Sequence, residues 1–102
     1  MKAQLVSLFA LSVIAVSAQA DAGFDLAQKK NCLACHAVDH KIVGPAYKDV
    51  AAKYAKDKDA VDKLSAKIIK GGSGVWGAIP MPPNAVSEAE AKQLAQWVLS
   101  QK

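Results

Sequence analysis

The pentapeptide Cys32-Leu33-Ala34-Cys35-His36 constrains the fold of this chain more than any other stretch. Cysteines three positions apart lie on one side of a helical turn, with Cβ atoms about 5 to 6 Å apart. Their sulfurs can each bond to one vinyl group of a single porphyrin, and the imidazole of His36 then meets the iron beneath the same ring. This spacing is the attachment motif of a c-type haem. We therefore predict one covalently bound haem c, held by Cys32 and Cys35, with His36 as an iron ligand.

Two other uses of a Cys-x-x-Cys pair are the alternatives to haem. A structural zinc site needs four ligands, and the remaining imidazole, His40, has no second cysteine pair to join. A redox dithiol of the thioredoxin type needs a βαβ context, and the sequence has no strand pattern that would supply it. The histidine directly after the second cysteine favours haem over both alternatives.

Residues 1–20 have the profile of a secretory signal peptide. Lys2 is the only charge in this stretch, its middle is mostly apolar, and Ala18-Gln19-Ala20 supplies a small-x-small cleavage pattern. An uncleaved membrane anchor is the alternative, but the apolar run is shorter than the roughly 20 residues that a span needs. We expect cleavage at this pattern, a periplasmic protein without stable membrane insertion, and one domain over residues 21–102.

The remainder of the chain has the periodicity of helices. Ser87 and Glu90 have the spacing of a capping box, and Asp59 is expected to cap the preceding helix. Four short helices are expected, over residues 25–31, 46–54, 60–70 and from 88 onwards. A domain of this size buries only about 60% of its unfolded surface, so a haem packed by apolar side chains would complete the core. The predicted fold is all-α, with about four short helices wrapped around one covalently attached haem.

The last helix should carry the contact that closes the fold. Its apolar residues recur on one stripe that includes Leu94 and Trp97. We expect Trp97 to pack against the first helix near Phe24 and Ala27.

A glycine-rich stretch, Gly72-Ser73-Gly74-Val75-Trp76-Gly77, matches the G-x-G-x-x-G pattern of dinucleotide-binding domains. That pattern requires a strand before it and a helix after it, whereas this stretch follows a predicted helix and leads into prolines. We interpret it as a turn-rich loop whose glycines let the backbone approach a large flat ligand. Trp76 would cover a haem edge, with its indole N–H available to a propionate.

The proline-rich stretch Ile79-Pro80-Met81-Pro82-Pro83-Asn84 is the second informative segment. Its prolines fix the backbone and forbid a helix. A lone methionine is ordinarily core filler, but in a chain with a haem site a methionine in a stiff loop is the leading candidate for the second axial ligand. The rival, His40, is only four residues from His36 and could hardly reach the opposite haem face.

Taken in order, these motifs resemble the small bacterial class I cytochromes c, of the cytochrome c-551 family. The resemblance covers residues 21–102 and includes, besides the haem motif, four further stretches. These are Val43-Gly44-Pro45-Ala46-Tyr47, Gly74-Val75-Trp76-Gly77, Ile79-Pro80-Met81-Pro82-Pro83-Asn84 and Trp97-Val98-Leu99. It implies thioether bonds at Cys32 and Cys35, and axial ligation by His36 and Met81.

The resemblance also implies roles for three residues around the ligands. The carbonyl of Pro45 accepts a hydrogen bond from the proximal imidazole. The amide of Asn84 contacts the methionine sulfur, and the indole of Trp76 binds a propionate.

The function implied by two protein ligands to iron is one-electron transfer, because neither axial position is open to substrate. We therefore expect an electron carrier of a respiratory chain and not an enzyme. The alternative is a small haem enzyme or gas sensor, peroxidase-like, in which Met81 is displaced. The resemblance suggests haem cd nitrite reductase, terminal oxidases or cytochrome c peroxidase as acceptors and a membrane bc complex as donor.

The charge of the chain favours transient electrostatic docking to redox proteins. The formal net charge is +4, and all 13 basic residues are lysines. Those that could ring the haem crevice and steer it to acidic patches are Lys29, Lys30, Lys41, Lys48, Lys67 and Lys70. Nucleic acid is not expected as a partner, because there is no arginine and no basic stripe interleaved with aromatic residues. We expect a monomer.

Overall fold

Short helices joined by long loops make up residues 22–102, the part of the chain that the computed structural model describes. The predicted signal peptide, 1–20, lies outside the described residues. The helical segments, in chain order, are residues 22–29, the 3₁₀ helix η2 (Cys32–Ala34), α2 (Tyr47–Lys53), α3 (Ala60–Lys70) and α4 (Glu88–Leu99). Pairing of β type within this part is limited to isolated bridges, His36 with Lys41 and Gly72 with Met81. The predicted all-α class is confirmed.

The N-terminal helix differs from its predicted range of 25–31. It already includes residue 22 and ends at residue 29, after which the chain turns. Asn31 adopts a left-handed conformation with a φ of 63°, which an α-helix cannot continue through and which asparagine tolerates better than most residues. The helix therefore stops just before the two cysteines, which begin a separate 3₁₀ turn.

The predicted cap of α3 is wrong in one detail. Asp59 occupies the N-cap position of α3, but its side chain accepts no capping hydrogen bond. The side chain of Asp57 makes the contacts in this turn instead: its Oδ1 accepts from the backbone N–H of Asp59 at 2.8 Å, and its Oδ2 binds Lys63 Nζ at 2.7 Å. Hydrogen bonding to Lys63 lowers the pKa of the Asp57 carboxyl.

The predicted capping box at the start of α4 is confirmed. Ser87 Oγ accepts from the backbone N–H of Glu90 at 3.0 Å, and Glu90 Oε1 accepts from the backbone N–H of Ser87 at 2.9 Å. The latter bond is the main reason that the pKa of the Glu90 carboxyl is lowered. Two orphan donors of the first helical turn are thereby satisfied.

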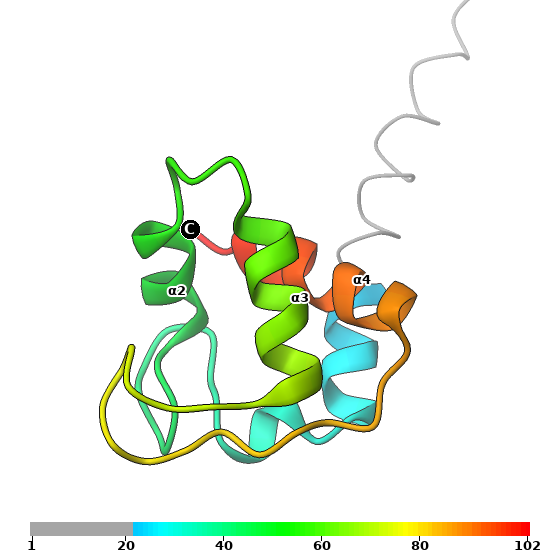
Figure 1. Cartoon of the computed structure of the whole chain (residues 1–102), viewed down its shortest axis with the longest axis horizontal. Coiled ribbons are helices and arrows are strands. Elements are labelled where there is room, and N and C mark those ends of the chain that lie inside the picture. The colour runs from blue at the N-terminus through cyan, green and yellow to red at the C-terminus, as the bar shows by residue number, and fades with distance from the viewer. Residues whose placement is uncertain (1–21) are drawn as a thin grey trace, which may run out of the picture.

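Helix α4 lies at the centre of the fold and packs against both α2 and α3. Figure 1 shows α3 running past α4, with α2 on the other side of the domain. The buried apolar cluster joins the N-terminal helix, α2 and α4, and its members are Ala27, Tyr47, Val50, Leu94, Trp97 and Val98. Leu94 is 1% exposed and Ala27 is fully buried. The core therefore forms along one face of α4.

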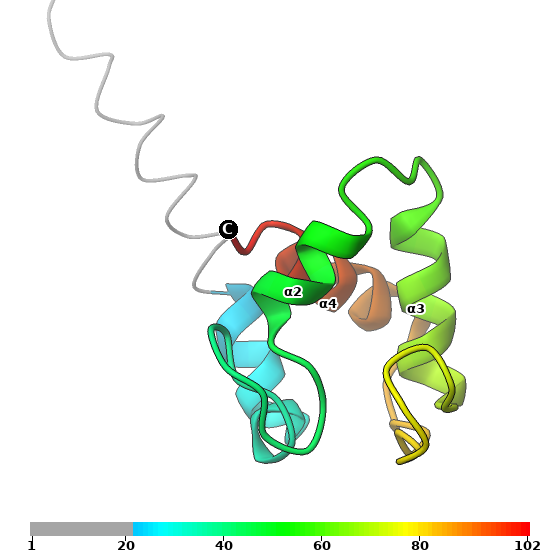
Figure 2. The same ribbon diagram turned by 90° about the vertical axis from the view of Figure 1, so that its left-hand side faces the viewer.

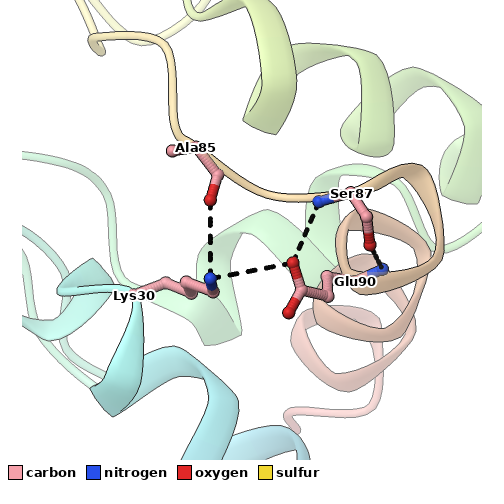
Figure 3. A network of polar contacts seen from close by, with 4 residues as sticks. All are labelled: Lys30, Ala85, Ser87 and Glu90. Atoms are coloured by element: carbon pink, nitrogen blue, oxygen red, sulfur yellow. Dashed lines mark hydrogen bonds and ion pairs between the residues drawn. The ribbon is translucent and has the colours of Figure 1, made fainter.

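The N-terminal helix packs against α4, as predicted. The rings of Phe24 and Trp97 lie 6.1 Å apart, and Ala27 belongs to the same cluster as Trp97. Gly23 lies so close to Trp97 that a Cβ atom at this position would be 2.4 Å from the indole. Lys30 adds a polar contact at the other end of the helix, because its Nζ lies 3.7 Å from Glu90 Oε1 and 3.5 Å from Ala85 O (Figure 3).

None of the helices within residues 22–102 is both long enough and apolar enough to cross a membrane.

Candidate haem site

The loop after the haem motif folds back on the motif. The backbone N–H groups of Val43 and Gly44 both donate to the carbonyl of Cys35, at 3.2 and 2.8 Å. Residues 42–44 therefore lie directly against the Cys35-His36 peptide, and the loop presents Pro45 to the imidazole. This arrangement follows from Gly44-Pro45, which ends any helix and turns the chain.

The imidazole of His36 is hydrogen-bonded to the backbone carbonyl of Pro45. Its Nδ1 lies 2.8 Å from the carbonyl oxygen of Pro45. A carbonyl can only accept, so Nδ1 carries the proton and Nε2 is left with its lone pair. This is the arrangement that metal-ligating histidines usually have, with the second ring nitrogen donating to a fixed acceptor.

Two neighbours pack against the faces and edge of the same ring. The ring of Tyr47 is stacked on that of His36, with centroids 4.9 Å apart and an interplanar angle of 20°. Gly44 lies on the ring so closely that a Cβ at this position would be 2.4 Å from His36 Cε1. Neither Tyr47 nor Gly44 has a role that the sequence alone predicts; the only signal is their place in the stretch Val43–Tyr47 that carries the resemblance.

The two cysteines have different surroundings. Both are free thiols and half-buried, and they lie at the start and just after the end of η2, where residues three apart eclipse one another. Burial raises the pKa of the Cys32 thiol, and the Tyr47 hydroxyl acts in the opposite direction. Burial is also the first cause of the raised pKa of Tyr47, which keeps that side chain neutral. Cys32 packs against the core, whereas Cys35 faces the cavity described next.

A cavity of about 380 Å³ opens between the haem motif and the loop that joins α3 to α4. This volume is within the range of about 300 to 1,000 Å³ typical of ligand pockets. Figure 2 shows the segment after the haem motif and the loop around residue 75 on opposite sides of the domain, with α2 and α4 above them. Cys35, His36, Pro45, Trp76 and Met81, all predicted site residues, line this one cavity. Cys32 and Asn84, also predicted, are not among its lining residues.

Helices α2, α3 and α4 also supply apolar and aromatic residues to the lining. These residues are Val50 and Tyr54 from α2 and the turn after it, Leu64 and Ile68 from α3, and Ala95 and Val98 from α4. Leu64 and Ile68 are half-buried and face the cavity. A flat apolar group bonded through thiols and an imidazole suits these walls.

The loop that carries Met81 is closed by backbone hydrogen bonds. Gly72 N–H donates to Met81 O at 3.0 Å, and Met81 N–H donates to Gly72 O at 2.9 Å. Gly71 has a φ of 73°, and a Cβ there would be 2.3 Å from Met81 O, so this close approach requires glycine. Met81 is thus held at a defined place on the cavity wall.

Asn84 anchors the far end of this loop to α3. Its backbone N–H and its Nδ2 both donate to the carbonyl of Ile68, at 3.2 and 2.8 Å. The Nδ2 also lies 3.3 Å from Pro82 O. These bonds satisfy one of the orphan carbonyls at the end of a helix. The contact of this amide with the sulfur of Met81 stays a prediction.

Trp76 lies at the rim of the cavity and is 43% exposed. The ammonium group of Lys53 lies 5.6 Å from the centroid of its ring. Its glycine-rich loop contains no helix and follows α3, which is not the context of a dinucleotide-binding motif.

The other imidazole, His40, is exposed and pairs with Asp39 at 2.9 Å on the outer side of the loop. This pairing is the main cause of a lowered pKa of the Asp39 carboxyl. His40, the rival for the second axial ligand, is absent from the cavity lining.

Comparison with known proteins identifies the family of the chain. The family model described as Cytochrome c matches residues 20–102. The chain is 55% identical to cytochrome c-552 of Nitrosomonas europaea, over the full length of both chains. It is 58% identical to cytochrome c-551 of Azotobacter vinelandii over 82 residues, which are 80% of this chain and 100% of that protein. The crystal structure of wild-type Nitrosomonas europaea cytochrome c552 superposes with a TM-score of 0.75 at 62% identity, covering 76% of this chain and 98% of that one.

Proposed function

Because the chain belongs to the cytochrome c family, as a small class I member with covalent c-type haem, we propose that it is a periplasmic one-electron carrier with His36 and Met81 as axial ligands. Haem-based electron transfer is the function of the family. The observation that carries the finer proposal is that both side chains line the same apolar cavity.

The hydrogen bond of His36 supports its role as the proximal ligand. The Pro45 carbonyl accepts the hydrogen bond of Nδ1–H, so Nε2 is the nitrogen free to bind iron. A carbonyl acceptor also fixes the ring orientation and makes the other nitrogen a better donor to metal. On the other wall, the paired hydrogen bonds between Gly72 and Met81 support a methionine ligand in a stiff loop.

The haem supplies the one-electron chemistry, cycling between Fe(II) and Fe(III). The chain contributes position and surroundings. Cys32 and Cys35 would hold the group by thioether bonds. A thioether ligand such as Met81 raises the reduction potential, and apolar walls disfavour the additional charge of the oxidised state. With both axial positions taken by side chains, binding of a substrate to iron is disfavoured.

Trp76 and Asn84 support the site from its rim. We assign the indole N–H of Trp76 to a haem propionate, because the ring lies at the edge of the cavity and is partly exposed. We assign Asn84 to holding the Met81 loop, through its bonds to Ile68 O and through the predicted contact of its amide with the methionine sulfur.

The proposed docking face for redox partners surrounds the cavity. All but one of the exposed large apolar residues of the described part lie on the two loops that flank it: Ile42, Val43, Val75, Trp76 and Ile79. Lys41 and Lys67 also line the cavity, and Lys53 lies over Trp76. An apolar patch with basic residues at its edge suits brief docking to an acidic partner.

The other lysines predicted for this face do not line the cavity, and two of them have partners or surroundings elsewhere. Lys30 pairs with Glu90, so its charge is partly compensated. Lys48 lines a second, separate hollow between α2 and the C-terminal residues. We therefore propose Lys41, Lys53 and Lys67 as the main steering charges.

We also propose that residues 1–20 are removed on export to the periplasm and that residues 21–102 are the working domain, as a monomer. The Azotobacter vinelandii relative supports this division, because its full length aligns with only 80% of this chain. Intact mass of the exported protein would test it: cleavage after Ala20 with one added haem is expected, and a retained leader would contradict the proposal.

An optical experiment tests the ligand set. The reduced holoprotein should show a low-spin spectrum that carbon monoxide does not change. A Met81→Ala variant should bind carbon monoxide readily and have a lower reduction potential. Met81 is proposed as a ligand and His40 is not, so His40→Ala is the matched control and should behave as the wild type. Carbon monoxide binding by the wild type would favour the enzyme or sensor alternative, and an unchanged potential in Met81→Ala would refute the methionine ligand.

Ionic strength tests the docking face. The rate of reduction by the iron(II)–EDTA dianion should fall as salt rises, because the field at the haem edge is positive. Lys67→Gln should lower this rate at low salt, whereas Lys92→Gln, on the exposed side of α4, should leave it unchanged. Equal effects of both variants would show that only net charge matters and not these positions.

A further inference from the structure

Tyr47 makes a contact that the proposed ligand set does not include. Its ring lies nearly parallel to the imidazole of His36, with an interplanar angle of 20° and centroids 4.9 Å apart. Tyr47 is the first residue of α2 and is only 6% exposed. The face of the imidazole is therefore covered by a buried aromatic ring.

The hydrogen bond to Pro45 does not by itself determine the plane of the imidazole. One hydrogen bond fixes the position of Nδ1, but the ring can still rock about that contact and about its Cβ–Cγ bond. A nearly parallel ring whose centroid is 4.9 Å away restricts this rocking, because rotation of the imidazole would drive its edge into the tyrosine. Gly44 restricts the imidazole further, because it lies so close to the His36 ring that a Cβ atom at Gly44 would collide with it.

Tyr47 is itself held from two sides. Its backbone N–H donates to Ala37 O at 2.9 Å, which ties the start of α2 to the residue after His36. Its ring meets the indole of Trp97 edge to face, at 5.3 Å between centroids and 77° between planes. Trp97 is buried in α4. The orientation of the Tyr47 ring is thus determined by the helical core, and so is the plane that it offers to the imidazole.

We propose, on the premise that His36 is the iron ligand, that Tyr47 is a positioning residue that sets the plane of the proximal imidazole. Its ring makes this contact and its hydroxyl is not needed for it. The core of α2 and α4 would then determine the ligand orientation at the iron, through a side chain that does not touch the metal.

The in-plane magnetic axes of low-spin ferric haem depend on the orientations of both axial ligands. None of the variants below changes the Met81 loop, so a change in the order of the haem methyl proton resonances of the oxidised holoprotein reports the imidazole plane. Tyr47→Leu removes the planar ring and should reorder these resonances. Tyr47→Phe keeps the ring and should retain the wild-type order. Tyr54→Leu is the matched control, because Tyr54 also lines the cavity but is not stacked on His36; it should retain the wild-type order too.

Three results would overturn the proposal: a wild-type order in Tyr47→Leu, an equal change in Tyr47→Phe, or an equal change in the control. If Tyr47→Leu does not fold, Tyr47→Met fills similar space without a planar ring and gives the same test. Pulsed electron–nuclear double resonance on wild-type protein labelled with ¹⁵N-histidine separates failure of the ligand assignment from failure of the role of Tyr47. Absence of a histidine nitrogen on iron would refute the ligand assignment itself, whereas its presence with unchanged variants would refute only the role of Tyr47.

Discussion

The ammonium group of Lys53 lies 5.6 Å from the centroid of the Trp76 ring. Lys53 is the last residue of α2, and Trp76 belongs to the loop between α3 and α4. This cation–π contact therefore joins two segments that flank the haem cavity and are far apart in the sequence. A partly exposed contact of this kind contributes about 0.5 to 1 kcal/mol.

Lys53→Gln should lower the free energy of unfolding by roughly that amount, about 0.5 to 1 kcal/mol, because the amide keeps a long side chain but loses the charge. It should also change the fluorescence of Trp76. Denaturant titration of the holoprotein measures the first effect. Lys56→Gln, in the exposed turn after α2, is the control and should change stability little. Equal losses in both variants would refute the contact as their cause.

Gly44→Ala should disturb the His36 ring directly. Its added Cβ would lie 2.4 to 2.9 Å from three ring atoms, and overpacking of this kind costs about 1 to 3 kcal/mol. The optical spectrum of the holoprotein should also change, because the proximal imidazole is displaced. Gly23→Ala creates an equally short contact with Trp97 and is the matched control. It should lose stability but change the spectrum less than Gly44→Ala does, because it reaches His36 only through Trp97 and Tyr47. A normal spectrum in Gly44→Ala would contradict this account.

Ser65→Ala should stabilise the protein. Ser65 is 8% exposed, and its Oγ has no hydrogen-bond partner within the described residues. An unsatisfied buried hydroxyl costs about 1 to 3 kcal/mol, and alanine is also the better helix former in the middle of α3. We expect a gain of about 1 kcal/mol in the free energy of unfolding. Ser73→Ala, in an exposed loop, should stay within about 0.5 kcal/mol of the wild type, and a loss of stability in Ser65→Ala would show that the hydroxyl is bonded.

Asp57 should make the stability of the domain depend on pH. Hydrogen bonding to Lys63 lowers the pKa of its carboxyl in the folded state. The carboxylate therefore stabilises the fold at pH values above about 3.9, the ordinary pKa of an aspartate, and this contribution is lost as the pH falls through the lowered pKa. Asp57→Asn should be less stable than the wild type at pH 7, and the difference should disappear in acid.

A double-mutant cycle separates this pair from other effects of Asp57. Asp57→Asn combined with Lys63→Gln should cost less than the sum of the two single changes at pH 7. Additive effects would show that Asp57 acts through the N–H of Asp59 and not through Lys63.

The core contacts of the two terminal helices could be foreseen, and so could the order of the helices. Ser87 and Glu90 form their capping box within four residues of chain, so tertiary structure has little influence on it. The apolar stripe with Leu94 and Trp97 can be buried on only one side, and the first helix packs against Trp97 through Phe24. The stop after residue 29 was missed, because a left-handed Asn31 is one of several conformations open to asparagine.

What the sequence by itself determined is the chemistry that depends on neighbours in the chain: two thiols and an imidazole within five residues, and a methionine held among prolines. What only the tertiary structure decided is which distant groups meet around that chemistry. It placed Tyr47 against His36, Lys53 over Trp76 and the Asn84 amide on Ile68 O. The physical reason is that backbone preferences act over a few residues, whereas each of these contacts requires separate segments to be packed in one arrangement before the two groups come within reach.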